Sequence, residues 1–498
     1  MRSKMNTFFT NMTLGTMVRR KALALLMLFA PVSAFVSAQT LNVKVGEVTY
    51  AHMAEQTGDM LFDNGSTLTV QGKTYQLAEV TSVTVNNNRV ADNTIAVNYQ
   101  GAKAQVTVAG NLAQHVTVSA VGADVRVVAD STYMGAIAYT LTGSSADGSF
   151  YMDGDAKASI TLDNLSLTSA KGGAITIDDG KKIDVNLVGT NVLADAATGL
   201  QSACLYINGH VDLLGEGTLA IKGNCRHAYS SDEYTRMVSG TLTVESAKAD
   251  GVHVKQYFEM CGGTLTVNSE GDGIDVGAKK KGCDNNGQLI LNGGVVTVTA
   301  TGEGAKALKA DSTITMTGGT VTGKTTGSAY FDATVNDIGG VSSLKAGGKF
   351  LMKGGSLSLT STGPGAKGIN ADGDIVIDNG QLSVVTTGDL YVYNALDTKP
   401  HAVKTDGTIT INGGTLFVAA SSAGRALSTD FAFLVNGGTL MGIGGKKSEP
   451  TGGTQKYKVY KAQNIKAGAT AAYDGVSFTI PAIYNNSKAQ VLVSKAGM

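Results

Sequence analysis

The chain has 498 residues, with 40 Lys and Arg against 40 Asp and Glu, so its formal net charge at pH 7 is zero. This balance removes any argument from overall charge for nucleic acid or an anionic membrane as the partner. With 64 Gly, 5 Pro, no Trp and 6% aromatic residues, the composition indicates short strands, tight turns and an aliphatic core in a chain long enough for two or three domains.

Residues 1–38 have the pattern of a secretory signal peptide. Arg19, Arg20 and Lys21 precede an apolar run over residues 22–36, and small residues follow up to Ala38. The run is shorter than the roughly 20 residues that span a bilayer. Cleavage near Ala38 is therefore favoured over a membrane anchor. We expect an exported protein, in the periplasm, at the cell surface or outside the cell, with no transmembrane segment after cleavage.

Residues 39–147 are expected to form a small N-terminal β module that caps the region after it. Apolar and polar residues alternate there with period 2, for example over residues 41–45 and 104–108, and Gly, Asn and Asp separate the runs. This pattern predicts short antiparallel strands. The module contains no motif that indicates chemistry.

Residues 148–445 contain a repeat, which predicts a solenoid. A three-residue phrase recurs about ten times: a polar residue, a small residue, then an aliphatic or aromatic one. The small positions are Ala174, Cys204, Ala228, Gly251, Gly273, Ala307, Ser343, Gly368, Ala402 and Ala426. Their spacing runs from 22 residues (273 − 251) to 36 (343 − 307), which is typical of one coil with loops of variable length.

The shortest repeat shows how one turn of the coil is built. Residues 241–244, 251–254 and 257–260 alternate like three strands, and Gly262-Gly263 closes the turn. Three strands per turn predict a right-handed parallel β-helix. The alternation directs these residues inward: Leu242, Val244, Leu265, Val267, Val296, Val298, Leu357, Leu359, Leu382, Val384, Leu416 and Val418. Residues 446–498 lack the phrase and are expected to form a C-terminal β cap over the open end.

Four cysteines lie inside the repeat and allow three pairings in an exported protein. They are Cys204, Cys225, Cys261 and Cys283. Cys204 occupies the small-residue position, so a buried packing thiol is expected there. No C-x-x-C pair is present, which argues against a zinc or redox centre at these residues.

The residue before each small position forms a column in which acidic residues give way to basic ones. Asp250 and Asp272 are 22 residues apart, so adjacent turns would place them ~4.8 Å from each other. A bridging Ca²⁺ fits that gap, and Glu270 and Asp275 lie near enough in sequence to add oxygen ligands. The alternative is that these carboxylates only shape Asp-Gly turns.

A run of cationic residues lies beside these carboxylates and suits an acidic polysaccharide, whose uronate groups bind both ammonium groups and calcium. The candidates for carbohydrate binding are Lys255, His253, Lys279, Lys280, Lys306, Lys309 and Lys367. The alternative is a solvated lysine face that keeps the coil soluble.

An enzyme would need a base beside the metal. Lys255 or Lys279 could take the C5 proton of a calcium-bound uronate in a β-elimination. The six histidines are scattered, and no Ser-His-Asp or H-E-x-x-H arrangement occurs. No opposed carboxylate pair indicates a glycosidase.

Five phrases of the repeat carry a resemblance to a known family, over about residues 148–445. They are Ala203-Cys-Leu-Tyr-Ile-Asn-Gly-His, Gly217-Thr-Leu-Ala-Ile-Lys-Gly-Asn, Ala249-Asp-Gly-Val-His-Val, Glu270-Gly-Asp-Gly-Ile-Asp-Val and Gly365-Ala-Lys-Gly-Ile-Asn-Ala-Asp-Gly. Their succession resembles the secreted carbohydrate-binding β-helix family of clostridial polygalacturonate-binding proteins, which is common in gut Bacteroidetes. The resemblance implies a right-handed parallel β-helix like that of pectate lyases, bound calcium and affinity for acidic plant polysaccharide. On that resemblance Asp250, Asp272 and Asp275 are the best calcium ligands.

The sequence therefore predicts a secreted, monomeric, non-catalytic protein that binds acidic, pectin-like polysaccharide with calcium and lysines. Two alternatives share the fold. One is a calcium-dependent polysaccharide lyase, with Lys255 or Lys279 as its base. The other is a surface adhesin or scaffold, in which the coil is only a rigid rod.

Overall fold

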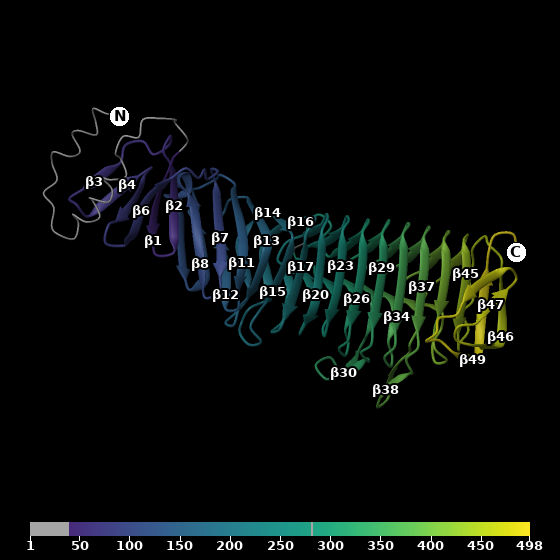
Figure 1. Ribbon diagram of the computed structural model, residues 1–498. Coiled ribbons are helices and arrows are strands. Elements are labelled where there is room, and N and C mark those ends of the chain that lie inside the picture. The colour runs from purple at the N-terminus through teal and green to yellow at the C-terminus, as the bar shows by residue number, and fades with distance from the viewer. Residues whose placement is uncertain (1–38, 280–281) are drawn as a thin grey trace. The chain divides into compact units, whose positions relative to one another are not determined.

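The computed structural model describes residues 39–279 and 282–498 (Figure 1). These residues form β-strands and a single 3₁₀ turn, Gly110–Leu112, with no α-helix among them. In the described part of the chain, no helix is long and apolar enough to cross a membrane. The chain divides into two compact units, Met1–Leu167 and Thr168–Met498. The predicted signal peptide, residues 1–38, and Lys280 lie outside the described residues.

The first unit mixes antiparallel and parallel strand pairs. Its strands are β1 (Thr40–Val45), β2 (Val48–Met53), β3 (Leu61–Asp63), β4 (Thr67–Val70), β5 (Lys73–Gln76), β6 (Val80–Asn86), β7 (Thr94–Gln100), β8 (Lys103–Ala109), β9 (Val116–Val121), β10 (Ala123–Ala129), β11 (Ile137–Ser145), β12 (Gly148–Asp153) and most of β13 (Ala158–Thr168). Neighbours in sequence such as β7 and β8 pair antiparallel, whereas β2 pairs with β8, and β7 with β11, in parallel. The prediction of a purely antiparallel module was wrong, because strands that are joined by long connections can return in the same direction.

The second unit begins with three strands and continues as three parallel ladders. The opening strands are β14 (Ile175–Val188), β15 (Thr190–Ala194) and β16 (Ala203–Gly215). Ladder A contains β18 (His227–Ser231), β21 (Val252–Val254), β24 (Ile274–Val276), β27 (Lys306–Ala310), β32 (Ser342–Ala346), β35 (Lys367–Ala371), β40 (Val403–Thr405) and β43 (Leu427–Thr429). Each of its strands pairs in parallel with the next.

The other two ladders follow the same rule. Ladder B contains β19 (Thr235–Met237), β22 (Tyr257–Met260), β25 (Gln288–Leu291), β28 (Ile314–Met316), β33 (Phe350–Met352), β36 (Ile375–Ile377), β41 (Ile409–Ile411) and β44 (Phe433–Val435). Ladder C contains β17 (Thr218–Gly223), β20 (Thr241–Ala247), β23 (Thr264–Ser269), β26 (Val295–Ala300), β29 (Thr320–Thr325), β34 (Ser356–Ser361), β37 (Gln381–Thr386), β42 (Thr415–Ala419) and β45 (Thr439–Gly444). The chain visits C, A and B in turn, so equivalent residues of successive turns stack as direct partners.

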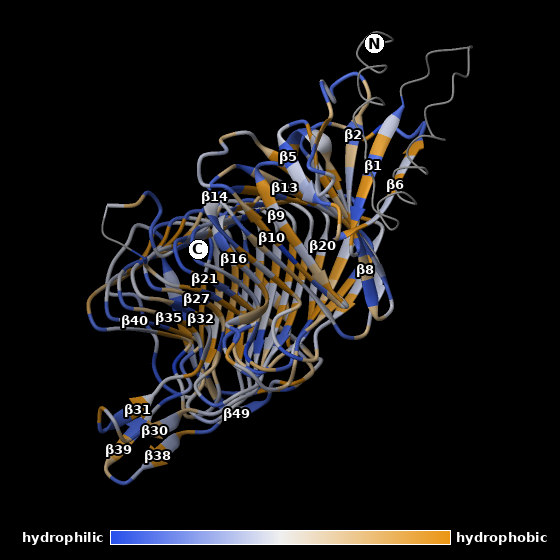
Figure 2. Ribbon diagram, turned by 90° about the vertical axis from the view of Figure 1, so that its left-hand side faces the viewer, coloured by the Kyte–Doolittle hydropathy of each residue, from blue (hydrophilic) through white to orange (hydrophobic). Residues whose placement is uncertain are grey.

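The core of the second unit consists of the inward residues of these ladders. All twelve aliphatic residues predicted to point inward are buried, which confirms the alternation. In ladder C, Gly323 stands between Val298 and Leu359 in that stack. Figure 2 shows the alternation as orange and pale segments along the strands. Burial of this aliphatic surface stabilises the fold by ~25 cal/mol per Å² removed from water.

The Gly-Gly corners behave as predicted. The second glycine of each pair has a positive φ, for example +75° at Gly263 and +70° at Gly294, where a side chain would be strained. The small position of the phrase is also explained by packing. A Cβ on Gly273 would lie 2.1 Å from Cγ1 of Val298, so the backbone of ladder A lies directly against the core there.

Two hairpins project between ladders C and A. They are β30 (Tyr330–Asp332) with β31 (Asp337–Gly339), and β38 (Tyr391–Tyr393) with β39 (Leu396–Thr398). Figure 2 shows them side by side below the ladders. Phe331 and Tyr393 stack with ring centroids 4.1 Å apart. The hairpins therefore support each other.

The parallel succession of ladder C ends at β45. There β49 (Asn486–Ser494) pairs antiparallel with β45 and with β46 (Tyr457–Ile465). A second antiparallel pair joins β47 (Thr470–Tyr473) and β48 (Val476–Thr479). These strands enclose an apolar cluster that includes Phe417, Met441 and Tyr484.

Candidate functional site

Two columns of polar side chains run along the outer side of ladder A. The first, which we call the edge column, contains the residue at or just before the start of each strand, and the second, the strand column, lies three positions later. The edge column is His227, Asp250, Asp272, Lys306, Ser342, Lys367, His401 and Arg425, and the strand column is Ser230, His253, Asp275, Lys309, Lys345, Asn370, Lys404 and Ser428. The two residues between them in each turn, such as Ala228 and Tyr229, are buried. The repeated phrase therefore encodes two columns of polar side chains separated by a buried pair, and some members of the columns, such as Ser230 and Ser342, are buried as well.

In part of the edge column, each side chain accepts the backbone N–H of the edge residue in the next turn. The Asp250 N–H donates to Nδ1 of His227 over 3.2 Å, and the Asp272 N–H donates to Oδ1 of Asp250 over 2.9 Å. The Lys306 N–H likewise donates to Oδ1 of Asp272 over 2.7 Å. These side chains thus satisfy amides that would otherwise lack partners. The turn-shaping role that the sequence left open is present here.

The remaining carboxylate oxygens of this region bind cationic side chains. Nδ1 of His253 lies 3.1 Å from Oδ2 of Asp250 and 3.0 Å from Oδ2 of Asp275. Nζ of Lys309 lies 3.2 Å from Oδ2 of Asp272 and 3.0 Å from Oδ1 of Asp275. Burial alone would lower the pKa of His253, but the carboxylates of Asp250 and Asp275 outweigh it and raise that pKa to about 9. His253 and Lys309 therefore neutralise this group of carboxylates.

The predicted calcium ligands do not fit a calcium ion in this arrangement. Calcium needs six to eight oxygen ligands at about 2.3–2.6 Å. The oxygens of Asp250, Asp272 and Asp275 are engaged by backbone N–H groups, His253 and Lys309. Glu270 pairs with Lys248 at an exposed position instead. A calcium ion would have to displace the Lys309 ammonium, so calcium binding remains a prediction without support from the geometry.

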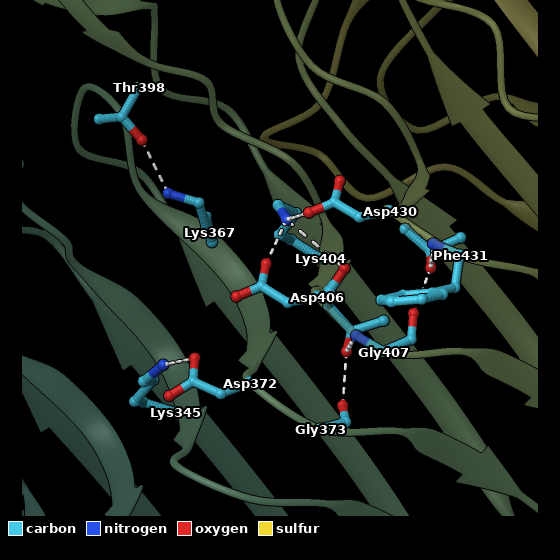
Figure 3. Close-up of polar contacts among 12 residues, drawn as sticks. Lys345, Lys367, Asp372, Gly373, Thr398, Lys404, Asp406, Gly407, Asp430 and Phe431 are labelled. Atoms are coloured by element: carbon cyan, nitrogen blue, oxygen red, sulfur yellow. Dashed lines mark hydrogen bonds and ion pairs between the residues drawn. The ribbon is translucent and has the colours of Figure 1, made fainter.

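The lysines further along ladder A fall into two groups, as Figure 3 shows. In the strand column, Lys345 pairs with Asp372, and Nζ of Lys404 lies 3.0 Å from Oδ2 of Asp430. In the edge column, Nζ of Lys367 instead donates to Oγ1 of Thr398 over 2.7 Å. Across the described residues, neither Lys367 nor Lys306 forms an ion pair with a carboxylate.

Both unpaired lysines are held in surroundings that disfavour their charge. Burial, reinforced by the charges of Lys404 and Lys345, lowers the pKa of Lys367 to about 8. Burial also lowers the pKa of Lys306, although the charges of Asp272 and Asp275 act in the opposite direction. An ammonium group that is desolvated without a counter-ion raises the free energy of the free protein. The edge column therefore presents two cationic positions that a bound anion would stabilise.

The candidate catalytic lysines lie outside both columns. Nζ of Lys255 is 2.8 Å from Oδ1 of Asp232, and Lys279 pairs with Glu233. Both ammonium groups already have carboxylate partners, so the structure brings neither to the unpaired positions. Of the lysines predicted from the sequence, Lys367 is the one whose surroundings lower its pKa to about 8.

Sequence reasoning missed a stack of aromatic rings that begins at His210, within β16. The ring of Tyr234 lies 4.6 Å from that of His210 and 4.8 Å from that of Tyr257, measured between centroids. The near-equal spacing of these rings, 24 residues (234 − 210) and then 23 (257 − 234), was the signal that could have revealed the stack. Because Tyr234 has a ring on each face, it offers no open face for sugar stacking.

All four cysteines are free thiols in the structure. Cys204 is buried, as its place in the small-residue column predicts, and burial raises its pKa well above the ordinary value. Cys204 therefore contributes packing, and none of the four described cysteines forms a disulfide that would join the turns.

Comparisons with known proteins give a family for the chain. The family model described as "Carbohydrate-binding domain-containing protein" matches residues 116–390, and the chain belongs to that family. Among solved structures, the chain is similar to a polysaccharide lyase-like protein from C. thermocellum, determined as a gadolinium derivative. The two are 20% identical with a TM-score of 0.39, and the match covers 47% of this chain and 90% of that one. No curated protein matches the chain.

Proposed function

We propose that this protein binds an acidic polysaccharide along the outer side of ladder A. The observation that carries the proposal is the pair of desolvated, unpaired ammonium groups of Lys306 and Lys367 in a member of a carbohydrate-binding family. A uronate carboxylate is a suitable counter-ion for each of them. An ionic hydrogen bond of this kind contributes about 1.5–3 kcal/mol.

The spacing of the two lysines suits a chain polymer. Lys306, Ser342 and Lys367 are direct partners on successive strands, so the two ammonium groups are two turns apart, or ~9.6 Å along the ladder. A linear glycan that lies along the ladder would present carboxylates to both Lys306 and Lys367. The strand-column lysines, which are already paired with carboxylates, would make only peripheral contacts with the glycan. The Ser342 side chain between them is buried.

We also propose an overall architecture and an exported state for the protein. Three parallel ladders that are visited in a fixed order support a right-handed parallel β-helix, with residues 39–147 as an N-terminal module and residues 446–498 as a cap. Residues 1–38 would direct export and would then be cleaved. The mature protein would be a monomer in a compartment where acidic polysaccharide is present. Calcium has no part in the binding steps described here.

The test is calorimetric titration of the mature protein with oligogalacturonate and with an uncharged glucan oligomer of the same length. We expect heat only with the acidic oligomer, and a loss of at least tenfold in affinity in Lys306→Met and in Lys367→Met. Lys345→Met is the matched control, because Lys345 lies in the same ladder but is paired with Asp372, and it should lose less than threefold. Equal losses in all three variants would contradict the proposal.

A polysaccharide lyase is the second candidate, because Lys367 has a pKa of about 8. A neutral amine there could remove the C5 proton of a uronate while the C4–O bond breaks and the leaving oxygen takes up a proton. Lys367→Arg separates the two functions, since Arg keeps the charge but stays protonated. A binder gives no unsaturated uronate by ultraviolet absorbance, whereas a lyase gives product that Lys367→Arg abolishes while binding is kept.

A further inference from the structure

A cluster of two imidazoles and a carboxylate lies at the other end of the same columns. His227 and Asp250 are consecutive residues of the edge column, and His253 is in the strand column on β21. One ligand atom from each of the three lies within 4.8 Å of the others, and no other group in the described part of the chain is arranged in this way. The cluster belongs to two successive turns of ladder A.

The separations within the cluster match those of a metal site. Oδ2 of Asp250 is 3.3 Å from Nδ1 of His227 and 3.1 Å from Nδ1 of His253. Ligand atoms around a tetrahedral Zn²⁺ with bonds of about 2.0–2.1 Å are ~3.3 Å apart. The two imidazole rings are nearly parallel, with centroids 4.5 Å apart and an interplanar angle of 19°. Because the lone pair of each Nδ1 lies in the plane of its ring, the two stacked rings must tilt toward a common point before all three ligand atoms can bind one ion.

We propose that His227, Asp250 and His253 bind a transition-metal cation of the Zn²⁺ type. Imidazole nitrogen is a ligand for zinc and related metals, whereas calcium takes oxygen ligands. The donor set therefore selects a different metal from the one that the carboxylates alone suggest. This inference does not depend on glycan binding.

A second carboxylate lies beside the cluster on the next turn. Oδ2 of Asp275 is 3.0 Å from Nδ1 of His253, which places a second carboxylate against the cluster. His227 is largely buried, with 8% of its surface exposed. Metal bonds to His227 and to His253 would join β18 and β21, so the ion would link two successive turns of ladder A.

Metal binding at this cluster breaks existing hydrogen bonds, which lowers the affinity for the ion. Nδ1 of His227 accepts the Asp250 N–H over 3.2 Å, and Nδ1 of His253 is shared between two carboxylates. Coordination through these atoms replaces those hydrogen bonds, and Nδ1 of His253 must also release the proton that it shares with the two carboxylates. We therefore expect weaker binding than at a closed structural zinc site with four committed ligands.

The test is equilibrium dialysis of the full-length mature protein against Zn²⁺ alone, followed by measurement of bound metal, with Ca²⁺ in parallel. We expect one Zn²⁺ per chain and a rise in the melting temperature with Zn²⁺ but not with Ca²⁺. Asp250→Asn and His253→Asn should each weaken Zn²⁺ binding at least tenfold. Asn at position 250 retains an oxygen that accepts the Asp272 N–H, so this variant keeps the backbone contact.

His401→Asn is the matched control. Nδ1 of His401 accepts the Arg425 N–H over 3.0 Å, as His227 does for Asp250, but its charged neighbours are Lys367, Arg425, Lys404 and Lys399. Zn²⁺ binding should be unchanged in this variant. Absence of Zn²⁺ binding in the wild-type chain, or equal binding in His253→Asn, would overturn the proposal.

The free cysteines provide another source of zinc binding, which a spectroscopic readout separates. Co²⁺ bound by imidazole and carboxylate lacks the near-ultraviolet charge-transfer band of a thiolate complex. We expect a Co²⁺ spectrum without that band and its loss in His253→Asn. A thiolate band that survives in His253→Asn would assign the metal to cysteine and refute the histidine site.

Discussion

The two halves of the edge column share one backbone position and differ in what that position does. At His227, Asp250 and Asp272 the side chain accepts the next turn's N–H, and the other carboxylate oxygens hold cations. At Lys306 and Lys367 the side chain cannot accept, and the N–H of His401, the edge residue that follows Lys367, donates instead to the backbone carbonyl of Lys399. Side chains of the column that accept hydrogen bonds stabilise the fold. The unpaired ammonium groups of Lys306 and Lys367 are available to bind an anionic ligand.

Among the variants that test this difference, Asp272→Ala is expected to change stability the most. Asp272→Ala removes the acceptor of the Lys306 N–H and one of the two carboxylates that hold Lys309. Loss of a buried acceptor and of a buried ion-pair partner should lower the free energy of unfolding by ~3 kcal/mol. Urea denaturation followed by circular dichroism measures the change. Asp272→Asn keeps an accepting oxygen, so a loss as large as that of Ala would show that the hydrogen bond is unimportant.

At the unpaired lysines of the edge column, we expect a substitution to stabilise the protein instead. Lys367→Met removes a desolvated ammonium group whose pKa is lowered to about 8, so the free energy of unfolding at pH 7 should rise by ~1–2 kcal/mol. The same denaturation experiment measures it. Lys345→Met, in which a paired lysine is lost, should give no gain. A destabilised Lys367→Met would mean that the Thr398 hydrogen bond outweighs the desolvation of the charge.

The pH dependence sharpens the assignment of function to Lys367. Its pKa in the folded protein is about 8, against an ordinary value of 10.5, so the unfolded chain binds more protons and the stability of the free protein rises with pH between these values. Affinity for an acidic oligomer should change in the opposite direction and fall by about tenfold from pH 7 to pH 9, because the bound form needs the ammonium group. Titrations in a pH series measure this fall, and Lys367→Arg should flatten it. A fall that persists in Lys367→Arg would assign it to another group.

The smallest effects are expected at the paired lysines outside the columns. Lys255→Ala and Lys279→Ala each break an ion pair at a partly exposed position, which contributes about 0–1 kcal/mol. Affinity for oligogalacturonate should change by less than twofold, as measured by calorimetry. A tenfold loss in either variant would move the glycan site from the edge column toward β18 and β21.

Much of the ladder region was predictable because its causes are local. Period-2 alternation placed Leu242 and Val244 inside, and the need for a positive φ placed glycine at corners such as Gly294. The prediction that Asp250 and Asp272 belong to adjacent turns is confirmed by the hydrogen bond between them. The mixed pairing of the first unit was missed, since strand direction after a long connection leaves no local pattern.

The candidate site was predicted as a list of residues but not as an arrangement. Asp272, Asp275 and Lys309 were all named as candidates, yet the sequence assigned the carboxylates to calcium and the lysine to a glycan, whereas the structure pairs them with each other. Spacing shows which residues share a column. Spacing does not show which charged side chains of two neighbouring turns pair with each other.

The sequence by itself thus determined the repeat, its inward aliphatic residues, its glycine corners and the polar identity of the outward columns, because each depends on neighbours a few residues away. Only the tertiary structure decided which cations are paired, which lysines are left desolvated and which histidines meet a carboxylate. Those outcomes depend on contacts between strands that are 22 or more residues apart in the chain. Loops of unequal length separate those strands, and only the packed turns bring their charges within ion-pair distance.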